Sequence, residues 1–460
     1  MYSISKVVQH TEAHFTDAVD AVCHYLRIPA ISCDPDHHDD VRRLAAEIRN
    51  DLEALGLNNA RVLELENALP SVAAEWLDAG PDKPTVLIYG HLDIQPVKGE
   101  VWDSPPHEPV IRNGRLYGRG SADDMGGWVS HIAALKAWFE TSKGPPCNIR
   151  MFIEGEEEIG SPNLERYMDA FPKAFESDVM ILTDCENPSE DIPGLTVSLR
   201  GLIEMKVSVE ALSADVHSGL WGNMVPDAPN ILIKLISSLL DDHGRMKVGL
   251  VEVEEEWKRK TENVPLNTEI IKQGGHLLDG VTPLPLFGRT EAEWLWRQPS
   301  LAVVATTLPT ASEKKNAIRA NAEAILSIRV PPGVDPKDLY DKIEGVLNEN
   351  CPSSVRVTVS AGNWSGEGWL YTPKGPYFEA ADRAYEKAWG HQLVHIGVGG
   401  SIPFVAMFGK RFGEMPLILN GVLDPLSTAH GPNESMHLGI FKKAITANVH
   451  LLDEISKLQP

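Results

Sequence analysis

The chain has 460 residues, of which 43% are apolar and 23% charged, a composition typical of a globular protein with a sizeable core. Its 42 Lys and Arg against 65 Asp and Glu give a formal net charge of -23, so we expect neither a nucleic-acid nor a membrane partner. The five cysteines lack C-x-x-C spacing, the N-terminus lacks a signal-peptide stretch, and no apolar run reaches about 18 residues. These features favour a cytoplasmic protein with reduced thiols.

The first part of the chain predicts helices that alternate with buried strands. Apolar residues at helical spacing predict helices near residues 15–26, 41–55 and 125–140. Nearly continuous apolar runs at residues 85–90, 149–155 and 179–183 predict strands that are buried on both faces. This alternation predicts an α/β domain with a mixed, mostly parallel sheet flanked by helices.

The pattern changes at Gly201, where apolar and polar residues alternate through 203–211 and predict a strand with one wet face. A helix at 230–240, strands at 301–307 and 324–330, a helix at 336–349 and a strand at 355–361 are predicted to follow. The order β-α-β-β-α-β is that of a ferredoxin-like α+β unit. Residues 245–299, acidic and then rich in proline, are predicted to form an insertion or exposed arm.

After Gly362 the α/β pattern returns. It predicts a helix at 378–389, a strand at 393–398, a Gly-Gly-Ser turn into a helix at 402–408, a strand at 416–420 and a final helix. We therefore expect one α/β domain, built from residues 1–200 and 366–460, that is interrupted by an inserted α+β domain at 201–365.

Potential metal ligands follow the predicted buried strands at their C-terminal ends, the edge where ligands collect in open α/β sheets. They are His91, Asp93, Glu156, Glu157, Glu158 and Asp184, with His430 further along and Asp123 at the start of the third helix. Considered alone, His91 and Asp93 are more simply interpreted as a hydrogen-bonded pair, and the three glutamates as a solvated acidic face. Asp123 could equally be a helix cap. Together, imidazoles and carboxylates without thiolate predict an open hydrolytic site for Zn²⁺ or Mn²⁺.

Six motifs carry a resemblance to a known family: GHLDIQPV, LYGRGSADDMGG, EGEEEIGS, ILTDCE, VGGSIP and TAHGPNE. In order and spacing they resemble the di-zinc metallopeptidases that include carnosine-type dipeptidases, succinyl-diaminopimelate desuccinylase, acetylornithine deacetylase and carboxypeptidase G, and most of all the dipeptidase branch. The resemblance implies that residues 1–200 and 366–460 form the catalytic domain. It also implies that residues 201–365 form a lid through which the protein forms a homodimer.

The resemblance further implies two divalent ions, Zn²⁺ first and Mn²⁺ or Co²⁺ as alternatives. Their ligands would be His91, Asp123, Glu158, Asp184 and His430, with Asp123 bridging both ions. Asp93 would orient His91, and Glu157 would act as general base in a bridging-hydroxide mechanism that cleaves dipeptides or short peptides.

Outside the metal site, the resemblance implies a role for several further residues. His217 would stabilise the oxyanion in the neighbouring subunit's site, and Arg329 would bind a substrate carboxylate. Asn316, Gly399, Gly400 and Ser401 would line the substrate pocket. Three positions depart from the family pattern, namely Met125, His107 and Arg319, and none of them removes a metal ligand.

Two other functions remain open at this point. An N-acyl amino acid deacylase would use the same metal core, and a non-catalytic binding protein would retain only the fold. The chain contains neither the G-x-S-x-G motif of serine hydrolases nor the H-E-x-x-H helix of single-zinc proteases.

Overall fold

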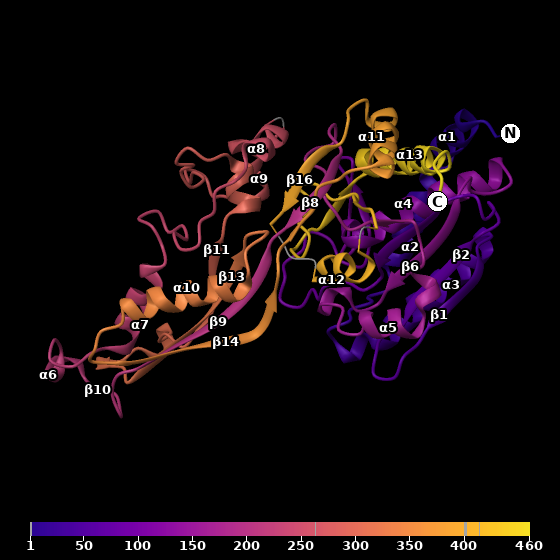
Figure 1. The fold of residues 1–460 in the computed structure, drawn as a ribbon. Coiled ribbons are helices and arrows are strands. Elements are labelled where there is room, and N and C mark those ends of the chain that lie inside the picture. Colours follow the sequence, from indigo (N-terminus) through magenta and orange to yellow (C-terminus); the bar gives the residue numbers. More distant parts are fainter. Residues whose placement is uncertain (1, 263, 400–402, 414) are drawn as a thin grey trace.

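The computed structural model describes residues 2–262, 264–399, 403–413 and 415–460. Figure 1 shows two lobes side by side, with both chain ends in the larger lobe and the middle of the chain in the other. The chain therefore leaves the larger lobe once and returns to it.

The larger lobe is built on a six-stranded sheet. The strands run in the order β1 (Asn58–Leu63), β2 (Ser71–Trp76), β6 (Asn148–Glu154), β3 (Thr85–His91), β7 (Val179–Leu182), β17 (Leu417–Leu419). The first two pairings are antiparallel and the other three are parallel, so the predicted mixed, mostly parallel sheet is confirmed. The sequence patterns did not predict β1, which is largely exposed and carries no apolar run. They also did not predict β2, which is mostly buried but has an apolar run of only Val72, Ala73 and Ala74 before Glu75.

Helices cover both faces of this sheet. On one face α3 (His38–Leu55) and α4 (Gly126–Thr141) pack on the strands. They share one hydrophobic core with α1 (Ile4–Ala13), α2 (Phe15–Leu26), α11 (Pro376–Trp389) and α13 (Leu438–Ile455). The other face packs against α5 (Leu164–Ala170) and α12 (Pro403–Phe412). Val86 and Ile88 of β3 belong to the first core, and Leu87 and Tyr89 belong to the second. Burial on both faces explains the continuous apolar run in this strand.

The second lobe contains an antiparallel four-stranded sheet. Its order is β11 (Ser300–Thr306), β13 (Asn321–Val330), β9 (Gly201–Glu210), β14 (Arg356–Gly366). The helices α7 (Ala228–Ser238) and α10 (Pro336–Glu349) pack on one face, where every second residue of β9 is buried. The predicted ferredoxin-like unit is confirmed, and the packing of its helices on one face of the sheet explains the alternating pattern of β9.

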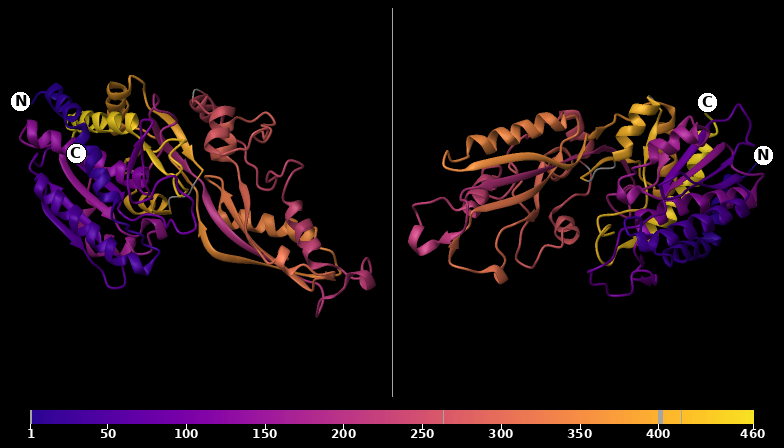
Figure 2. Two further views of the ribbon diagram at one scale, coloured as in Figure 1. Left: turned by 180° about the vertical axis from the view of Figure 1, so that it is seen from behind. Right: turned by 90° about the horizontal axis from the view of Figure 1, so that it is seen from below.

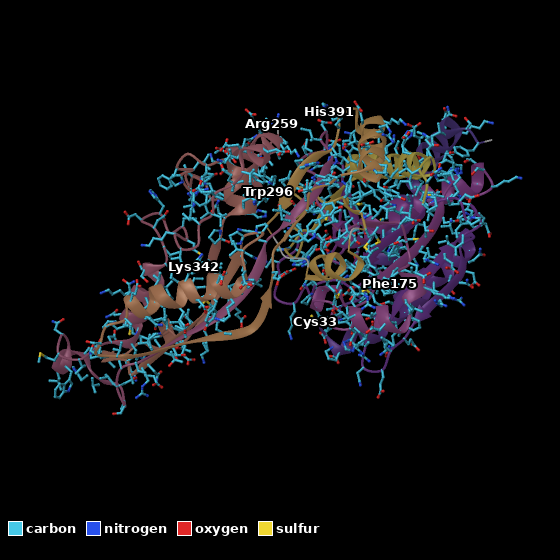
Figure 3. All side chains as sticks on the ribbon, in the orientation of Figure 1. Cys33, Phe175, Arg259, Trp296, Lys342 and His391 are labelled. Carbon is cyan, nitrogen blue, oxygen red and sulfur yellow. The ribbon has the colours of Figure 1, made fainter. Side chains whose placement is uncertain are left out.

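The segment 245–299 is a long excursion between α7 and β11 that contains α8 (Glu255–Thr261) and α9 (Thr268–Gly274). It is more than an exposed arm. Trp296, labelled in Figure 3, packs with Val264 of the same segment and with Ile396 of β16 (Val394–Val398). β16 pairs with β8 (Gly194–Leu199) in a small sheet of three strands between the lobes. The segment therefore fastens the second lobe to the first.

The far end of the second lobe is formed by β10 (Val216–His217), α6 (Ser218–Trp221) and β12 (Ala317–Ile318). Figures 1 and 2 place this end of the lobe at the greatest remove from the six-stranded sheet. Within the described part of the chain, no helix has both the length and the apolar character needed to cross a bilayer.

Candidate metal centre

Loops at one edge of the six-stranded sheet hold five potential metal ligands. β3 ends at His91, Asp184 follows β7, and Glu158 follows β6. Asp123 lies just before α4, and His430 lies in the loop that precedes β18 (Ser435–His437). Because β3, β6 and β7 run parallel, their C-terminal ends share this edge.

The five side chains form two groups that share one carboxylate. The first group is His91, Asp123 and Asp184, and the second is Asp123, Glu158 and His430. His91 Nε2 lies 3.1 Å from Asp123 Oδ1 and 4.0 Å from Asp184 Oδ2. His430 Nε2 lies 3.0 Å from Asp123 Oδ2 and 3.2 Å from Glu158 Oε2. The two oxygens of Asp123 therefore face different groups, as a bridging ligand requires.

Asp93 is fully buried and fixes the loop after β6. Its carboxylate oxygens accept hydrogen bonds from the backbone N–H groups of Glu157, at 3.1 Å, and Glu158, at 3.0 Å. Nδ1 of His91 lies 3.0 Å from the backbone oxygen of Asp93 and 3.6 Å from its side chain. Asp93 thus orients the imidazole mainly through its backbone, while its side chain positions the two glutamates.

The three consecutive glutamates have different surroundings. Glu156 is buried and accepts hydrogen bonds from the backbone N–H of Leu69 and the side chain of Asn163, both at 2.8 Å. It therefore ties the loop to the sheet. Glu157 and Glu158 lie on the Asp93 side of the loop and interact electrostatically with His91 and Asp123.

Glu434 is a buried residue of the site that the sequence motifs did not predict. Its carboxylate accepts backbone hydrogen bonds from Gly120 at 3.0 Å, Ala122 at 3.1 Å and Asp123 at 3.2 Å. It also accepts a hydrogen bond from the guanidinium of Arg119 at 2.9 Å. Glu434 thus joins the loop of His430 to the loop of Asp123. Its place at the end of the TAHGPNE motif is the feature of the sequence that could have indicated its role.

We expect Glu434→Gln to lower the free energy of unfolding by about 3 kcal/mol, the low end for a broken buried ion pair, because Arg119 keeps a second partner in Glu100. The amide would also present a donor to the backbone N–H groups that Glu434 now accepts from. Urea unfolding of both proteins measures the difference. A change below about 0.5 kcal/mol, the range of ordinary surface substitutions, would contradict this account of Glu434.

The electrostatics of the site show an excess of buried negative charge. Burial raises the pKa of Glu157 well above its usual range, and the neighbouring carboxylates of Glu158 and Asp123 add to this effect against the opposing influence of His91. Burial and the same kind of repulsion raise the pKa of Asp184. Hydrogen bonds to Asp123 and Glu158 raise the pKa of His430 to about 11. The group therefore favours cations beside its carboxylates.

The donor set fits divalent transition ions. Each group offers one imidazole and two carboxylates, which is the ligand chemistry of open Zn²⁺ sites and is compatible with Mn²⁺ and Co²⁺. Neither group includes a thiolate. Three protein ligands per ion would leave positions for water and substrate.

His217 and Asn316 lie together, but far from these groups within one chain. The backbone N–H of Ser218 donates to the backbone oxygen of Asn316 at 3.2 Å, in the β10 and β12 region at the far end of the second lobe. Nδ1 of the exposed His217 accepts a hydrogen bond from the N–H of Gly219 at 3.0 Å. The neutral ring therefore carries its proton on Nε2 and can donate it to a carbonyl oxygen.

Arg329 and Gly399 are brought together by Arg200 at the junction of the lobes. Nε of Arg200 donates to the backbone oxygen of Gly399 at 3.0 Å, and burial together with the charge of Arg329 lowers the pKa of Arg200 to about 10. Two neighbouring guanidinium groups favour an anion beside them. The sequence analysis did not predict a role for Arg200. Its place directly after a buried strand is the feature that could have indicated one. Gly400 and Ser401 lie outside the described residues.

The three departures from the family pattern lie in different places. Met125 is fully buried beneath the start of α4, and His107 is partly buried. Arg319 pairs with Asp215 at 3.3 Å near the far end of the second lobe. None of the three belongs to either metal-ligand group.

Comparison with known proteins identifies the family to which the chain belongs. Residues 87–454 match the family described as Peptidase family M20/M25/M40. A cysteinylglycine-S-conjugate dipeptidase of Corynebacterium striatum is 32% identical over 405 residues, covering 87% of each chain. The Beta-Ala-His dipeptidase of Homo sapiens is 27% identical over 463 residues, covering 94% of this chain and 89% of the human protein.

The solved structures agree on the fold. That of the dipeptidase Dug1p from Saccharomyces cerevisiae matches with a TM-score of 0.82 and 24% identity, and the match covers 99% of both chains. The family match extends over most of the chain, and the Corynebacterium relative is similar along nearly its whole length. This chain therefore belongs to the peptidase family M20/M25/M40.

Proposed function

We propose that this protein hydrolyses the amide bond of dipeptides or short peptides with two divalent ions, Zn²⁺ before Mn²⁺ or Co²⁺. The observation that carries the proposal is the pair of ligand groups that share Asp123, with Glu157 beside them. The dipeptidases among its relatives support the substrate class. A protein that only bound peptides would have no need for a base next to the ligands, so this arrangement also disfavours a non-catalytic role.

The chemistry divides between the ions and the side chains. When bound, the ions would acidify a water molecule and polarise the scissile carbonyl. Glu157 would accept the proton of the attacking water and deliver it to the departing amine. The electrostatic interactions of Glu157 with His91 and Asp123 support this role, because they place its carboxylate beside the side chains that would hold the ions.

We also propose that the protein acts as a homodimer through residues 201–365. Among the described residues, the edge strand β11 pairs in its four-stranded sheet with β13 alone, and it exposes Val303 and Val304, at 45% and 56%. Such an edge favours pairing with another strand. The position of His217 supports the same conclusion, because its proton on Nε2 would serve a neighbouring subunit's site rather than its own.

Subunit mixing tests this arrangement. We expect His217→Ala and Glu157→Gln homodimers to be nearly inactive, and their mixture to regain activity after dissociation and reassociation. Each heterodimer would contain one complete site, so random pairing predicts about a quarter of the wild-type rate. A mixture no more active than its parents, although a size measurement shows that subunits have exchanged, would rule out a contribution from the neighbouring subunit.

The substrate is proposed to be short and to carry a free carboxylate. Arg329 and Arg200 offer guanidinium groups for that carboxylate near Gly399. In addition, Gly274 of α9 lies so close to the backbone oxygen of Pro425 that an added Cβ would meet it at 2.8 Å. The segment 245–299 thus lies against the loop that carries His430, which favours small substrates.

A substrate panel tests the function. Dipeptides, the same dipeptides with an amidated C-terminus, and N-acetyl and N-succinyl amino acids should be compared by kcat/KM. We expect dipeptides with a free carboxylate to be cleaved fastest. Faster cleavage of the N-acyl amino acids would replace the dipeptidase proposal with the deacylase alternative, and turnover of none of them after loading with Zn²⁺, Mn²⁺ or Co²⁺ would refute both.

Two broader expectations accompany this proposal. We propose that residues 1–200 and 366–460 act as the catalytic domain and residues 201–365 as an inserted lid. We also propose a cytoplasmic location, which the five unpaired cysteines support because disulfides are rare there.

A further inference from the structure

A third group of metal-binding side chains lies on the outside of the larger lobe. It contains His10 near the end of α1, His14 in the turn between α1 and α2, and Glu140 near the end of α4. One potential ligand atom from each lies within 4.8 Å of the others. Figure 1 shows α1 on the side of this lobe that faces away from the second lobe, so the group is separate from the centre described above.

The two histidines are spaced to share an ion. They are four residues apart, so His14, directly after the last residue of α1, lies next to His10 of the last turn. Their rings stack with centroids 4.2 Å apart and an interplanar angle of 18°, so one ring has to turn about its side-chain torsions to direct both lone pairs at one ion. Nε2 of His10 also lies 2.7 Å from a carboxylate oxygen of Glu140. An imidazole pair and a carboxylate therefore converge from two helices.

The surroundings of the group prepare it for a cation. Nδ1 of His14 lies 2.9 Å from Oδ2 of Asp17, and when that nitrogen carries the proton, Nε2 keeps its lone pair for a metal. A cavity of about 100 Å³ adjoins His10, His14 and Asp17, well above the volume that one water molecule needs. Lys136 also lines this cavity, but it pairs with Asp17 at 3.6 Å and so leaves Glu140 as the carboxylate for an ion.

We propose that His10, His14 and Glu140 form a third divalent metal site that binds Zn²⁺ or a similar transition ion, with water completing its coordination. Two imidazoles and one carboxylate suit such ions better than Mg²⁺ or Ca²⁺, which prefer oxygen ligands. The bound ion would join α1 to α4, whose contact includes the ion pair of His10 and Glu140. Its role is to fasten the N-terminal helix, and it is independent of the proposed hydrolysis.

The test counts Zn²⁺ ions in three full-length proteins: the wild type, the variant His10→Ala/His14→Ala and the control His24→Ala. The control also loses a pair between a histidine and a glutamate on different helices, since Nε2 of His24 lies 2.7 Å from Glu47. After equilibrium dialysis against Zn²⁺ alone, we expect elemental analysis to find one equivalent fewer in the double variant than in the wild type and the control. Equal metal content in all three proteins would overturn the proposal.

Hydrogen exchange provides a second measurement that does not depend on the count. Zn²⁺ should slow amide exchange in residues 4–13 of the wild type and of the control, and should leave exchange there unchanged in the double variant. The same slowing in the double variant would also overturn the proposal. Peptide hydrolysis should be equal in all three proteins. If the centre around Asp123 did not bind its two ions, all three proteins would hold fewer ions. The double variant would still hold one equivalent fewer than the wild type and the control.

Discussion

The substitution Glu157→Gln is expected to lower kcat by about 10²–10⁴-fold while both divalent ions stay bound. Glutamine keeps the size of the side chain but accepts no proton from water, so the attack and the departure of the amine both lose their proton carrier. Elemental analysis gives the metal content, and steady-state kinetics with a dipeptide gives kcat. Undiminished turnover in this variant would remove Glu157 from the mechanism.

The neighbouring glutamate supplies the matched control. Glu156→Gln changes the same group one residue earlier, where the carboxylate accepts hydrogen bonds from Leu69 and Asn163 rather than facing the ligands. We expect this variant to lose stability but to keep kcat within a few-fold of the wild type. An equal loss of kcat in both variants would indicate that the loop, and not the proton carrier, had been damaged.

The second large effect is expected at Asp123, because it belongs to both ligand groups. Asp123→Ala should lose both ions and nearly all activity, whereas His91→Ala should lose the ion of its own group first. Two hydrogen-bonded histidines also hold the pKa of Asp123 well below its usual range, against the effect of burial, so the carboxylate is ionised and ready to bind cations at neutral pH. Metal content after dialysis, together with circular dichroism to verify folding, measures this effect.

A control for Asp123 lies on the exposed surface. Asp103 belongs to neither ligand group, and Asp103→Ala should keep both ions and the activity. Retention of both ions by Asp123→Ala, or their equal loss from Asp103→Ala, would show that the shared carboxylate does not hold the pair.

Most of the fold could be predicted from apolar periodicity. The strands β3, β6 and β7 are buried on both faces, and β9 is buried on one, so each shows the pattern that its surroundings require. The strand β1 is mostly exposed and antiparallel, so it has no such pattern. The packing of Trp296 against Ile396 was also not predictable, because contacts between distant segments depend on how the lobes meet.

The metal ligands could also be predicted from the sequence, but the residues that support them could not. Ligand candidates stood at strand ends, and the general rule for open α/β sheets brings those ends together. Motif spacing does not show which buried carboxylate supports a neighbouring loop, so Glu434 was missed although it accepts hydrogen bonds from three backbone groups near Asp123. Arg200 was not predicted either, because its partner Gly399 is distant in the sequence.

A crystal structure of the Zn²⁺-loaded protein, with anomalous scattering recorded at the zinc edge, would show directly whether the two ligand groups hold a pair of ions. Two anomalous peaks are expected, one on either side of the Asp123 carboxylate. One peak should lie beside His91 and Asp184, and the other beside Glu158 and His430. A single peak there, or peaks that do not share Asp123, would contradict the proposal of a two-metal peptidase.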